Sequence, residues 1–169
     1  MKKLSGFSVI ELLIIISMVT ALIIVAAPSF YGLFKKQFLI YHSNQLIQNI
    51  KSIQSNAFIE NKDYKIGFDS IDKTYTIWAY LNSQWQENEH YEFDETVSIE
   101  FGNVLSNNHH ILYNHNGNTY FCTSTNTPTE CESTPLTTKA WLTLKTEKKD
   151  IIIEFMPING YVSSNVGVK

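Results

Sequence analysis

The chain begins with one long apolar run. The segment Leu12–Pro28 consists of Ile, Leu, Val, Met, Ala and a closing proline, and only Ser17 and Thr20 interrupt it. The wider segment 7–33 holds 27 residues, and a helix of that length rises about 40 Å at about 1.5 Å per residue. Because the hydrocarbon core of a bilayer is roughly 30 Å thick, the pattern predicts a membrane-spanning helix over 7–33.

The helical period continues beyond the apolar run, now with one apolar face. Apolar residues recur at spacings of 7, 4, 3 and 4, which places them on one side of a helix. Asn61 and Asp63 are unfavourable inside a helix, so we expect the helix to end near residue 60. The segment 34–61 is therefore interpreted as an amphipathic half that packs on a sheet. Its stripe consists of Leu39, Leu46, Ile50, Ile53 and Ala57.

From Tyr64 onward, short segments rich in aromatic and β-branched residues replace the helical pattern. Asn116-Gly117 and Asn159-Gly160 have the sequence of hairpin turns. No helical pattern separates the segments, so antiparallel pairing is expected. The predicted fold class is α+β, a long N-terminal helix packed on an antiparallel β-sheet head over 62–169. The predicted strands are Tyr64–Phe68, Tyr75–Leu81, His90–Phe93, Val97–Phe101, His110–Tyr113, Thr119–Cys122, Ala140–Thr146 and Ile151–Met156.

The composition agrees with a helical appendage on one domain. The chain has 169 residues, a net charge of −3 and 13% aromatic residues, which excludes a disordered chain. It has 13 Lys and no Arg against 16 acidic residues, which argues against a broad nucleic-acid face. Between Lys3 and Lys35 the only charged side chain is Glu11.

An acidic residue near the start of an apolar run is costly unless it is neutralised or paired. A signal anchor or a cleaved secretory signal peptide would both have the basic start Lys2 and Lys3 and the apolar core. Neither explains Glu11, and a cleavage site at Val25–Ala27 is poor because Pro28 follows it. The two lysines favour a cytoplasmic N-terminus with the rest of the chain outside.

The N-terminal run Lys2–Leu13 (KKLSGFSVIELL) resembles the class III signal of type IV prepilins and type II secretion pseudopilins. The resemblance implies cleavage of the leader 1–6 by a prepilin peptidase between Gly6 and Phe7, with N-methylation of Phe7. It assigns subunit assembly to Glu11. It also implies other pilins or pseudopilins, the peptidase, an inner-membrane assembly platform and, before assembly, membrane lipid as partners. The implied location is the bacterial inner membrane, single-pass with a periplasmic head, and then the pilus or pseudopilus.

Physical chemistry supports the assembly role. Cleavage at Phe7 creates a positive amine one helical turn from Glu11, because positions i and i+4 are neighbours on a helix. Within an apolar bundle the two charges compensate each other, and a buried charge that loses its partner costs about 3–5 kcal/mol. Pro28 lacks an N–H group and is expected to kink or loosen the helix. A proline simply tolerated in a membrane helix is the alternative.

The order of parts is similar to the GspH/FimT-type branch of the family, which implies a minor pilin or pseudopilin. Some members of that branch bind DNA for uptake through a Gly-Arg-x-Arg motif near the C-terminus. Here Tyr161 and Ser163 stand where the arginines would be, and 11 Lys oppose 15 acidic residues from Lys35 onward, a net charge of −4. Lys145, Lys148 and Lys149 form only a small basic turn, so a nucleic-acid partner is disfavoured. The sequence does not separate a pilus from a secretion pseudopilus.

Two cysteines, Cys122 and Cys131, enclose a polar loop in the part expected outside the membrane, so we predict one disulfide between them. No Cys-x-x-Cys pattern supports a metal site there. Adjacent residues on a strand face opposite sides, so His109 and His110 do not readily share a metal, and with His115 they are interpreted as a solvated loop. No catalytic or phosphate-binding motif occurs, so we expect no enzyme, cofactor or metal. The residues Glu87, Glu89, Glu92, Asp94 and Glu95 are interpreted as a solvated acidic face.

Overall fold

The computed structural model describes residues 8–102, 105–107, 109–123, 126–132, 135–147, 149–156 and 161–168, and it describes no side chains at 26–29, 31–32, 35 and 166–168. The predicted cleavage residues Gly6 and Phe7 and the Asn159-Gly160 turn lie outside these ranges. The chain divides into two compact units, Met1–Lys35 and Lys36–Lys169. Each unit is described by itself.

One helix, α1 (Val9–Glu60), accounts for the described part of the first unit and continues into the second. Its side chains are exposed throughout Val9–Val25. The backbone is helical at Pro28, whose side chain is not described. Within the part of the chain described with side chains, no helix qualifies as a membrane span by length and hydropathy together.

The end of α1 confirms the boundary expected from the sequence. Asn61 adopts the left-handed conformation, with φ of 53°, which ends the helical run. The Lys62 N–H donates to the Ala57 carbonyl oxygen at 3.2 Å, closing a Schellman-type turn. Asparagine tolerates this backbone conformation better than most residues with a Cβ atom. A helix stop without glycine therefore has a local explanation.

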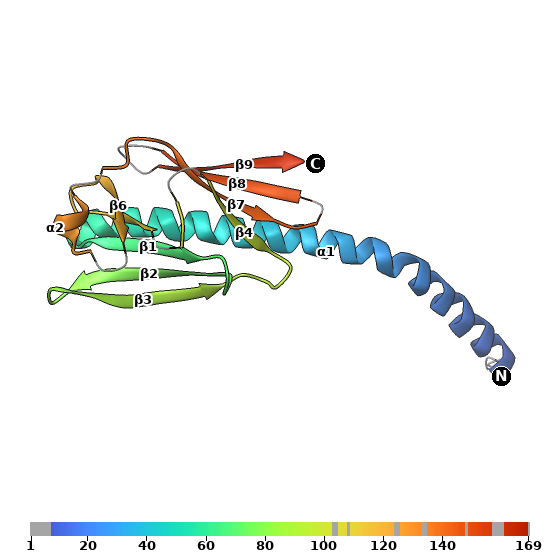
Figure 1. Ribbon diagram of the computed structural model, residues 1–169. Helices are drawn as coiled ribbons and strands as arrows, with labels where there is room; N and C mark the ends of the chain where they lie inside the picture. Colours follow the sequence, from blue (N-terminus) through green and yellow to red (C-terminus); the bar gives the residue numbers. More distant parts are fainter. Residues whose placement is uncertain are drawn as a thin grey trace. The chain divides into compact units, whose positions relative to one another are not determined.

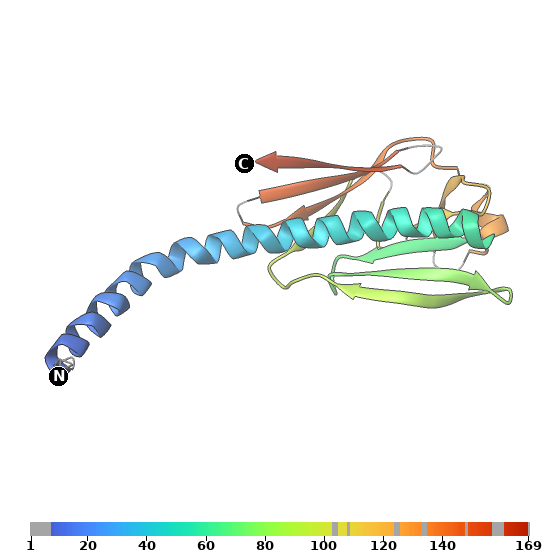
Figure 2. The same cartoon turned by 180° about the vertical axis from the view of Figure 1, so that it is seen from behind.

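The second unit contains two antiparallel sheets (Figures 1 and 2). Sheet A has the strand order β3-β2-β1-β5-β6, and sheet B has the order β4-β7-β8-β9. A short helix, α2 (Pro128–Cys131), lies between β6 and β7 in the chain. The strands are β1 (Tyr64–Asp69), β2 (Thr74–Leu81), β3 (Gln84–Glu92), β4 (Ser98–Gly102), β5 (His109–Tyr113), β6 (Thr119–Thr123), β7 (Ala140–Lys145), β8 (Lys149–Phe155) and β9 (Val162–Val168).

One apolar cluster joins the second half of α1 to both sheets. The predicted helix stripe, Leu39, Leu46, Ile50, Ile53 and Ala57, is buried. Leu46 and Ile50, both fully buried, lie in the same cluster as Ile66 of β1 and Leu142 of β7. A polar contact adds to this packing, because the Asn49 amide donates to the Tyr75 hydroxyl oxygen at 2.9 Å. The α+β class with antiparallel sheets is confirmed.

Strand β3 is longer than the sequence predicts, since it begins at Gln84 and not at His90. The preceding turn uses Asn82 and Ser83, with φ values of 52° and 64°. A two-residue hairpin turn requires this left-handed pair, which is usually signalled by glycine. Apart from the half-buried Trp85, the first half of β3 is polar and exposed, so it has neither the glycine nor the alternation that would reveal it.

The Asn116-Gly117 hairpin is confirmed between β5 and β6, where Tyr113 pairs with Thr119. Gly117 has φ of 81°, the conformation that glycine adopts without steric cost. The buried Asn114 side chain organises the turn, because its Oδ1 accepts hydrogen bonds from the N–H groups of Asn116 and Asn118. The whole five-residue connection, and not the dipeptide alone, sets the register of these strands.

Gly67 allows two aromatic rings to lie directly on β1. A Cβ atom there would overlap the imidazole of His110 and lie 3.0 Å from Cζ3 of Trp78. The His110 and Trp78 rings meet edge to face, with centroids 4.9 Å apart. On this face of sheet A, the rings of His110 and Trp78 therefore pack directly on the backbone of Gly67.

We predict that Gly67→Ala lowers the free energy of unfolding by about 1–3 kcal/mol, because overpacking forces these rings from their positions. Urea unfolding of the full chain in detergent, followed by tryptophan fluorescence, measures the change. Gly117→Asn is the matched control, since no atom lies within 4 Å of the added Cβ position and asparagine tolerates positive φ. Equal stability of Gly67→Ala and the wild type would contradict the close packing.

Candidate functional site

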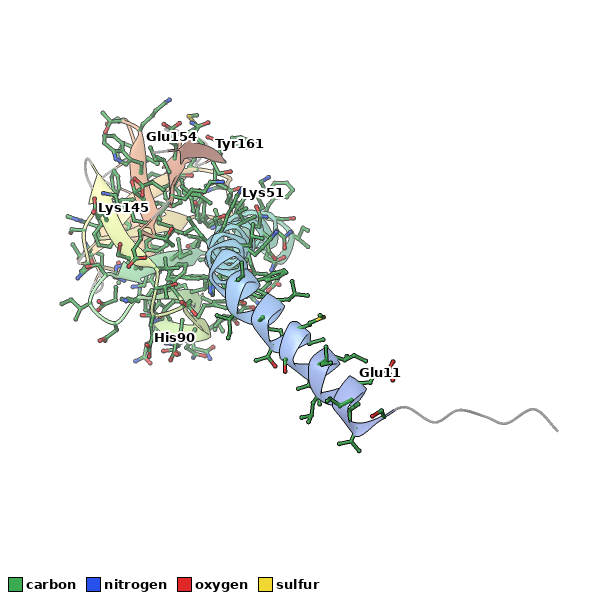
Figure 3. All side chains as sticks on the ribbon, turned by 90° about the vertical axis from the view of Figure 1, so that its right-hand side faces the viewer. Glu11, Lys51, His90, Lys145, Glu154 and Tyr161 are labelled. Carbon is green, nitrogen blue, oxygen red and sulfur yellow. A yellow bond between two sulfur atoms is a disulfide. The ribbon has the colours of Figure 1, made fainter. Side chains whose placement is uncertain are left out.

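The strongest functional feature is an apolar helical surface that carries one acid. In the first turn of α1, Glu11 is exposed and projects outward from the helix (Figure 3). No hydrogen bond or ion pair joins it to another described residue. The Ser17 hydroxyl donates to the Leu13 carbonyl oxygen, and the Thr20 hydroxyl donates to the carbonyl oxygen four residues before it, both at 2.7 Å. These two hydroxyls form hydrogen bonds within the helix. Glu11 is therefore the polar side chain of Val9–Val25 that is left without a hydrogen-bond partner among the described residues.

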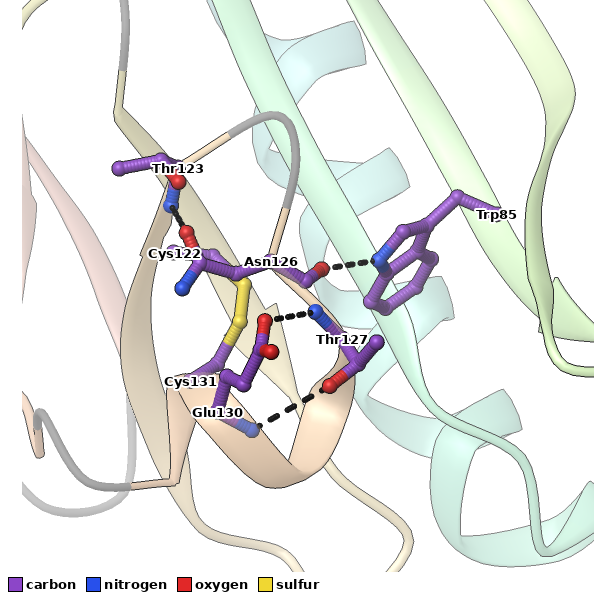
Figure 4. Close-up of a disulfide and its surroundings, with 7 residues drawn as sticks. All are labelled: Trp85, Cys122, Thr123, Asn126, Thr127, Glu130 and Cys131. Carbon is purple, nitrogen blue, oxygen red and sulfur yellow. Dashed lines mark hydrogen bonds between the residues drawn. A yellow bond between two sulfur atoms is a disulfide. The ribbon is translucent and has the colours of Figure 1, made fainter.

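The structure contains the predicted disulfide between Cys122 and Cys131. Their Cα atoms are 5.0 Å apart, within the usual range for a disulfide. The enclosed loop contains α2, which begins with a capping box that the sequence analysis did not predict (Figure 4). The Thr127 hydroxyl accepts from the Glu130 N–H, and the Glu130 carboxylate accepts from the Thr127 N–H at 3.0 Å. A Thr-x-x-Glu pattern of this kind was available as a sequence signal.

The disulfide loop is attached to sheet A through a tryptophan. The Trp85 indole N–H donates to the Asn126 carbonyl oxygen at 2.6 Å (Figure 4). Trp85 also packs against a second apolar cluster that contains Leu112 and both cysteines. The loop therefore covers the outer face of sheet A, the face turned away from α1.

A buried lysine lies beside this cluster. Lys65 is only 2% exposed, and its Nζ lies 4.3 Å from the centroid of the Trp85 ring and 5.5 Å from that of Trp78. Burial lowers the pKa of Lys65 to about 8, because it disfavours the charged ammonium. Sequence reasoning did not find this residue, since a lysine on a strand usually lies in water. The aromatic rings supply a cation–π environment within the sheet.

The expectation that the histidines form a solvated loop is wrong for two of them. His109 and His110 belong to β5, and His110 is 5% exposed. They face opposite sides, as predicted, because His109 contacts Ser106 at 2.7 Å while His110 contacts Trp78. His115 lies in the β5–β6 turn, where Nδ1 and an oxygen of Asp63 are 2.8 Å apart. The positions that the structure describes contain no group of three or more His, Cys, Asp or Glu that could hold a metal.

The charged segments lie on the surface of the head. Glu87, Glu89 and Glu92 are exposed on β3, in agreement with a solvated acidic face. In the basic turn, Lys145 forms an ion pair with Glu100 of β4. Lys148 lies outside the described residues. Part of the positive charge of this turn is thus neutralised by Glu100 in the same sheet.

No protein-family model matches this chain, and no curated protein sequence matches it. Solved structures do. The minor pseudopilin EpsH from the type II secretion system of Vibrio cholerae matches in two structures. In one, the TM-score is 0.55 at 10% identity, over 79% of this chain and 97% of EpsH, and in the other it is 0.51 at 9% identity, over 76% and 94%. The type IV minor pilin FimU of Pseudomonas aeruginosa matches with a TM-score of 0.51 at 10% identity, over 80% of this chain and 90% of FimU.

These matches cover most of the chain and nearly all of each matched protein. They show a pilin-like fold, as the resemblance to the pilin family implied. At about one identical residue in ten, the agreement concerns the path of the chain and not its surface chemistry.

We predict that His110 makes the stability of the head depend on pH. Burial is the largest cause that lowers the pKa of His110, to about 4, and the nearby Lys65 charge adds to it. The unfolded chain binds a proton near pH 6.5 and the folded chain does not, so stability decreases as the pH falls from 6.5 to 4, by about 3 kcal/mol at most.

Urea unfolding at pH 4 to 7.5 tests this. His110→Leu should weaken the pH dependence by about one proton, whereas His90→Gln, on the exposed face of β3, should keep the wild-type profile. Parallel curves for wild type and His110→Leu would contradict the prediction.

Proposed function

We propose that the chain is a minor pilin or pseudopilin subunit that assembles into a type IV pilus or a type II secretion pseudopilus. The observation that carries the proposal is the exposed apolar surface Val9–Val25 with Glu11 at its start. A contiguous apolar surface of this size requires a cover of lipid or protein. The pilin-like head fold supports the same role, since its structural neighbours are a minor pseudopilin and a minor pilin.

The proposed history of the subunit begins in the membrane. Lys2 and Lys3 hold the N-terminus in the cytoplasm, and lipid covers the apolar segment 7–33 before assembly. The head then lies in the periplasm, where oxidation permits the Cys122–Cys131 disulfide. In the filament, the apolar segments of neighbouring subunits replace the lipid. The inner-membrane assembly platform and a prepilin peptidase are the proposed partners in this exchange.

The proposed peptidase step prepares the assembly contact. Cleavage between Gly6 and Phe7 removes the two lysines and produces a new amine, which the same enzyme methylates. That amine is one helical turn from Glu11 in the same chain and within reach of Glu11 in a neighbour. The pair neutralises two charges that an apolar bundle would otherwise leave uncompensated. Pro28 is proposed to loosen the helix where neighbouring subunits adjust their packing.

The proposed role is structural and not catalytic. Polar groups of the head such as the capping box of α2 and the Asn114 side chain serve its own packing. The neighbours include one pseudopilin and one pilus subunit, so the proposal covers both kinds of filament.

We predict that the mature chain begins at Phe7 and carries a methyl group on its amine. Mass spectrometry of the membrane fraction from the producing cell measures both features. Gly6→Val should block processing, because a β-branched residue prevents the close backbone approach that glycine allows. A mature chain that starts at any other residue would refute the prediction.

We predict that Glu11→Ala is inserted and processed but enters filaments poorly, with a loss of about tenfold or more, because the amine of a neighbour loses its partner. Immunoblots of the sheared filament fraction and of the membrane fraction measure assembly and insertion separately. Ser17→Ala is the matched control, since the Ser17 hydroxyl is already bonded within the helix. Normal incorporation of Glu11→Ala would remove the proposed role of the acid.

A further inference from the structure

Each sheet ends in two edge strands, and both edges of sheet A are shielded. Strand β3 carries three exposed glutamates, which oppose pairing with another strand. Strand β6 is covered by the chain that follows α2. There Tyr120 pairs with Pro135, and the Leu136 N–H donates to the Thr119 carbonyl oxygen at 3.1 Å.

In sheet B, one edge is shielded and the other is not. Strand β4 is short and carries the Glu100–Lys145 ion pair. Strand β9 holds no charged residue and no proline over Val162–Val168. Among the residues that the structure describes, β9 pairs with β8 alone. An uncharged edge strand of seven residues is an exception to the way proteins protect such edges.

The register shows which backbone groups of β9 face outward. The Met156 N–H donates to the Tyr161 carbonyl oxygen at 2.9 Å. Met156 and Tyr161 are therefore a hydrogen-bonded pair, whose backbone groups point toward each other. Hydrogen-bonded and non-hydrogen-bonded pairs alternate along an antiparallel ladder. Ser163 and Asn165 therefore bond to β8, while Ser164 directs its N–H and C=O away from the sheet. Ser164 is exposed, and no hydrogen bond links its backbone to another described residue outside the ladder.

We infer that the free edge of β9 is the docking site for an extended strand supplied by a different subunit of the filament. This inference rests on the proposed function. The outward N–H and C=O groups provide the hydrogen bonds, and the absence of charge on β9 favours an uncharged partner strand. Addition of such a strand lengthens sheet B by one strand on the side opposite β4.

A second copy of β9 does not suit this edge in a filament. Within the second unit, α1 and β9 run in roughly opposite directions (Figures 1 and 2). A two-fold dimer that paired β9 with β9 antiparallel would also reverse one α1 relative to the other. Subunits that enter one membrane with the same orientation have parallel helices. An antiparallel β9–β9 pair therefore does not fit such a filament, and the proposed partner strand belongs to another subunit type.

Proline at Ser164 tests the edge without breaking the β8–β9 ladder, because the N–H that it removes faces outward. In the full chain, in the producing cell, Ser164→Pro should reduce incorporation into the sheared filament fraction by about tenfold, as proline removes a donor and its ring blocks the approach. Ser164→Ala keeps the N–H and should assemble normally. Ser164→Lys, which adds only an edge charge, should also reduce incorporation. Unfolding midpoints in detergent verify that each variant is folded.

A photo-crosslinking residue at Asn165 identifies the partner, with mass spectrometry of the adduct. An adduct with another subunit that has an apolar, acid-bearing N-terminal helix supports the inference, and an adduct of two copies of this chain overturns it. Wild-type incorporation of folded Ser164→Pro and Ser164→Lys also overturns it, while the proposed function stands. If the wild-type chain itself is missing from the filament fraction, the proposed function fails and this inference fails with it.

Discussion

The apolar stripe on α1 is the contact on which the head depends. Among the described residues no ladder connects the two sheets, so they meet only through their side chains and this helix. Ile50 of the helix is fully buried in one cluster with Ile66 of sheet A and Leu142 of sheet B. Burial of such a side chain contributes about 1.5–3 kcal/mol, and each sheet alone would leave an apolar face in water. Both sheets therefore bury their apolar faces against the same helix.

The two sheets differ in how completely their faces are covered by other parts of the chain. Sheet A is covered on one face by α1 and on the other by the disulfide loop, with Trp85 and Lys65 packed between. Sheet B has no comparable cover on its outer face among the described residues, where Trp141 is 37% exposed and lies over Gly102. The outer face of sheet B is therefore less covered by the chain itself than the outer face of sheet A.

The sequence predicted the features that follow from repeated local patterns. The helix stripe, most strands, the Asn116-Gly117 turn and the disulfide are such features. It did not predict the start of β3, whose turn uses left-handed Asn82 and Ser83 without glycine. Nor did it predict the buried Lys65 and His110, because their environment consists of strands distant in sequence. The proposed processing at Gly6 and Phe7 rests on the sequence alone, because both residues lie outside the described ranges.

The path of β4 affects the order in which the head assembles. The chain leaves sheet A after β3, contributes β4 to sheet B, returns to complete sheet A with β5 and β6, and supplies the partner of β4 only at β7. Pairing across such a separation is slow, since the intervening loop must close first. During synthesis, all strands of sheet A are made before β7, so sheet A can form while β4 is still unpaired. The last-made strands, β7–β9, are therefore the ones that complete this head.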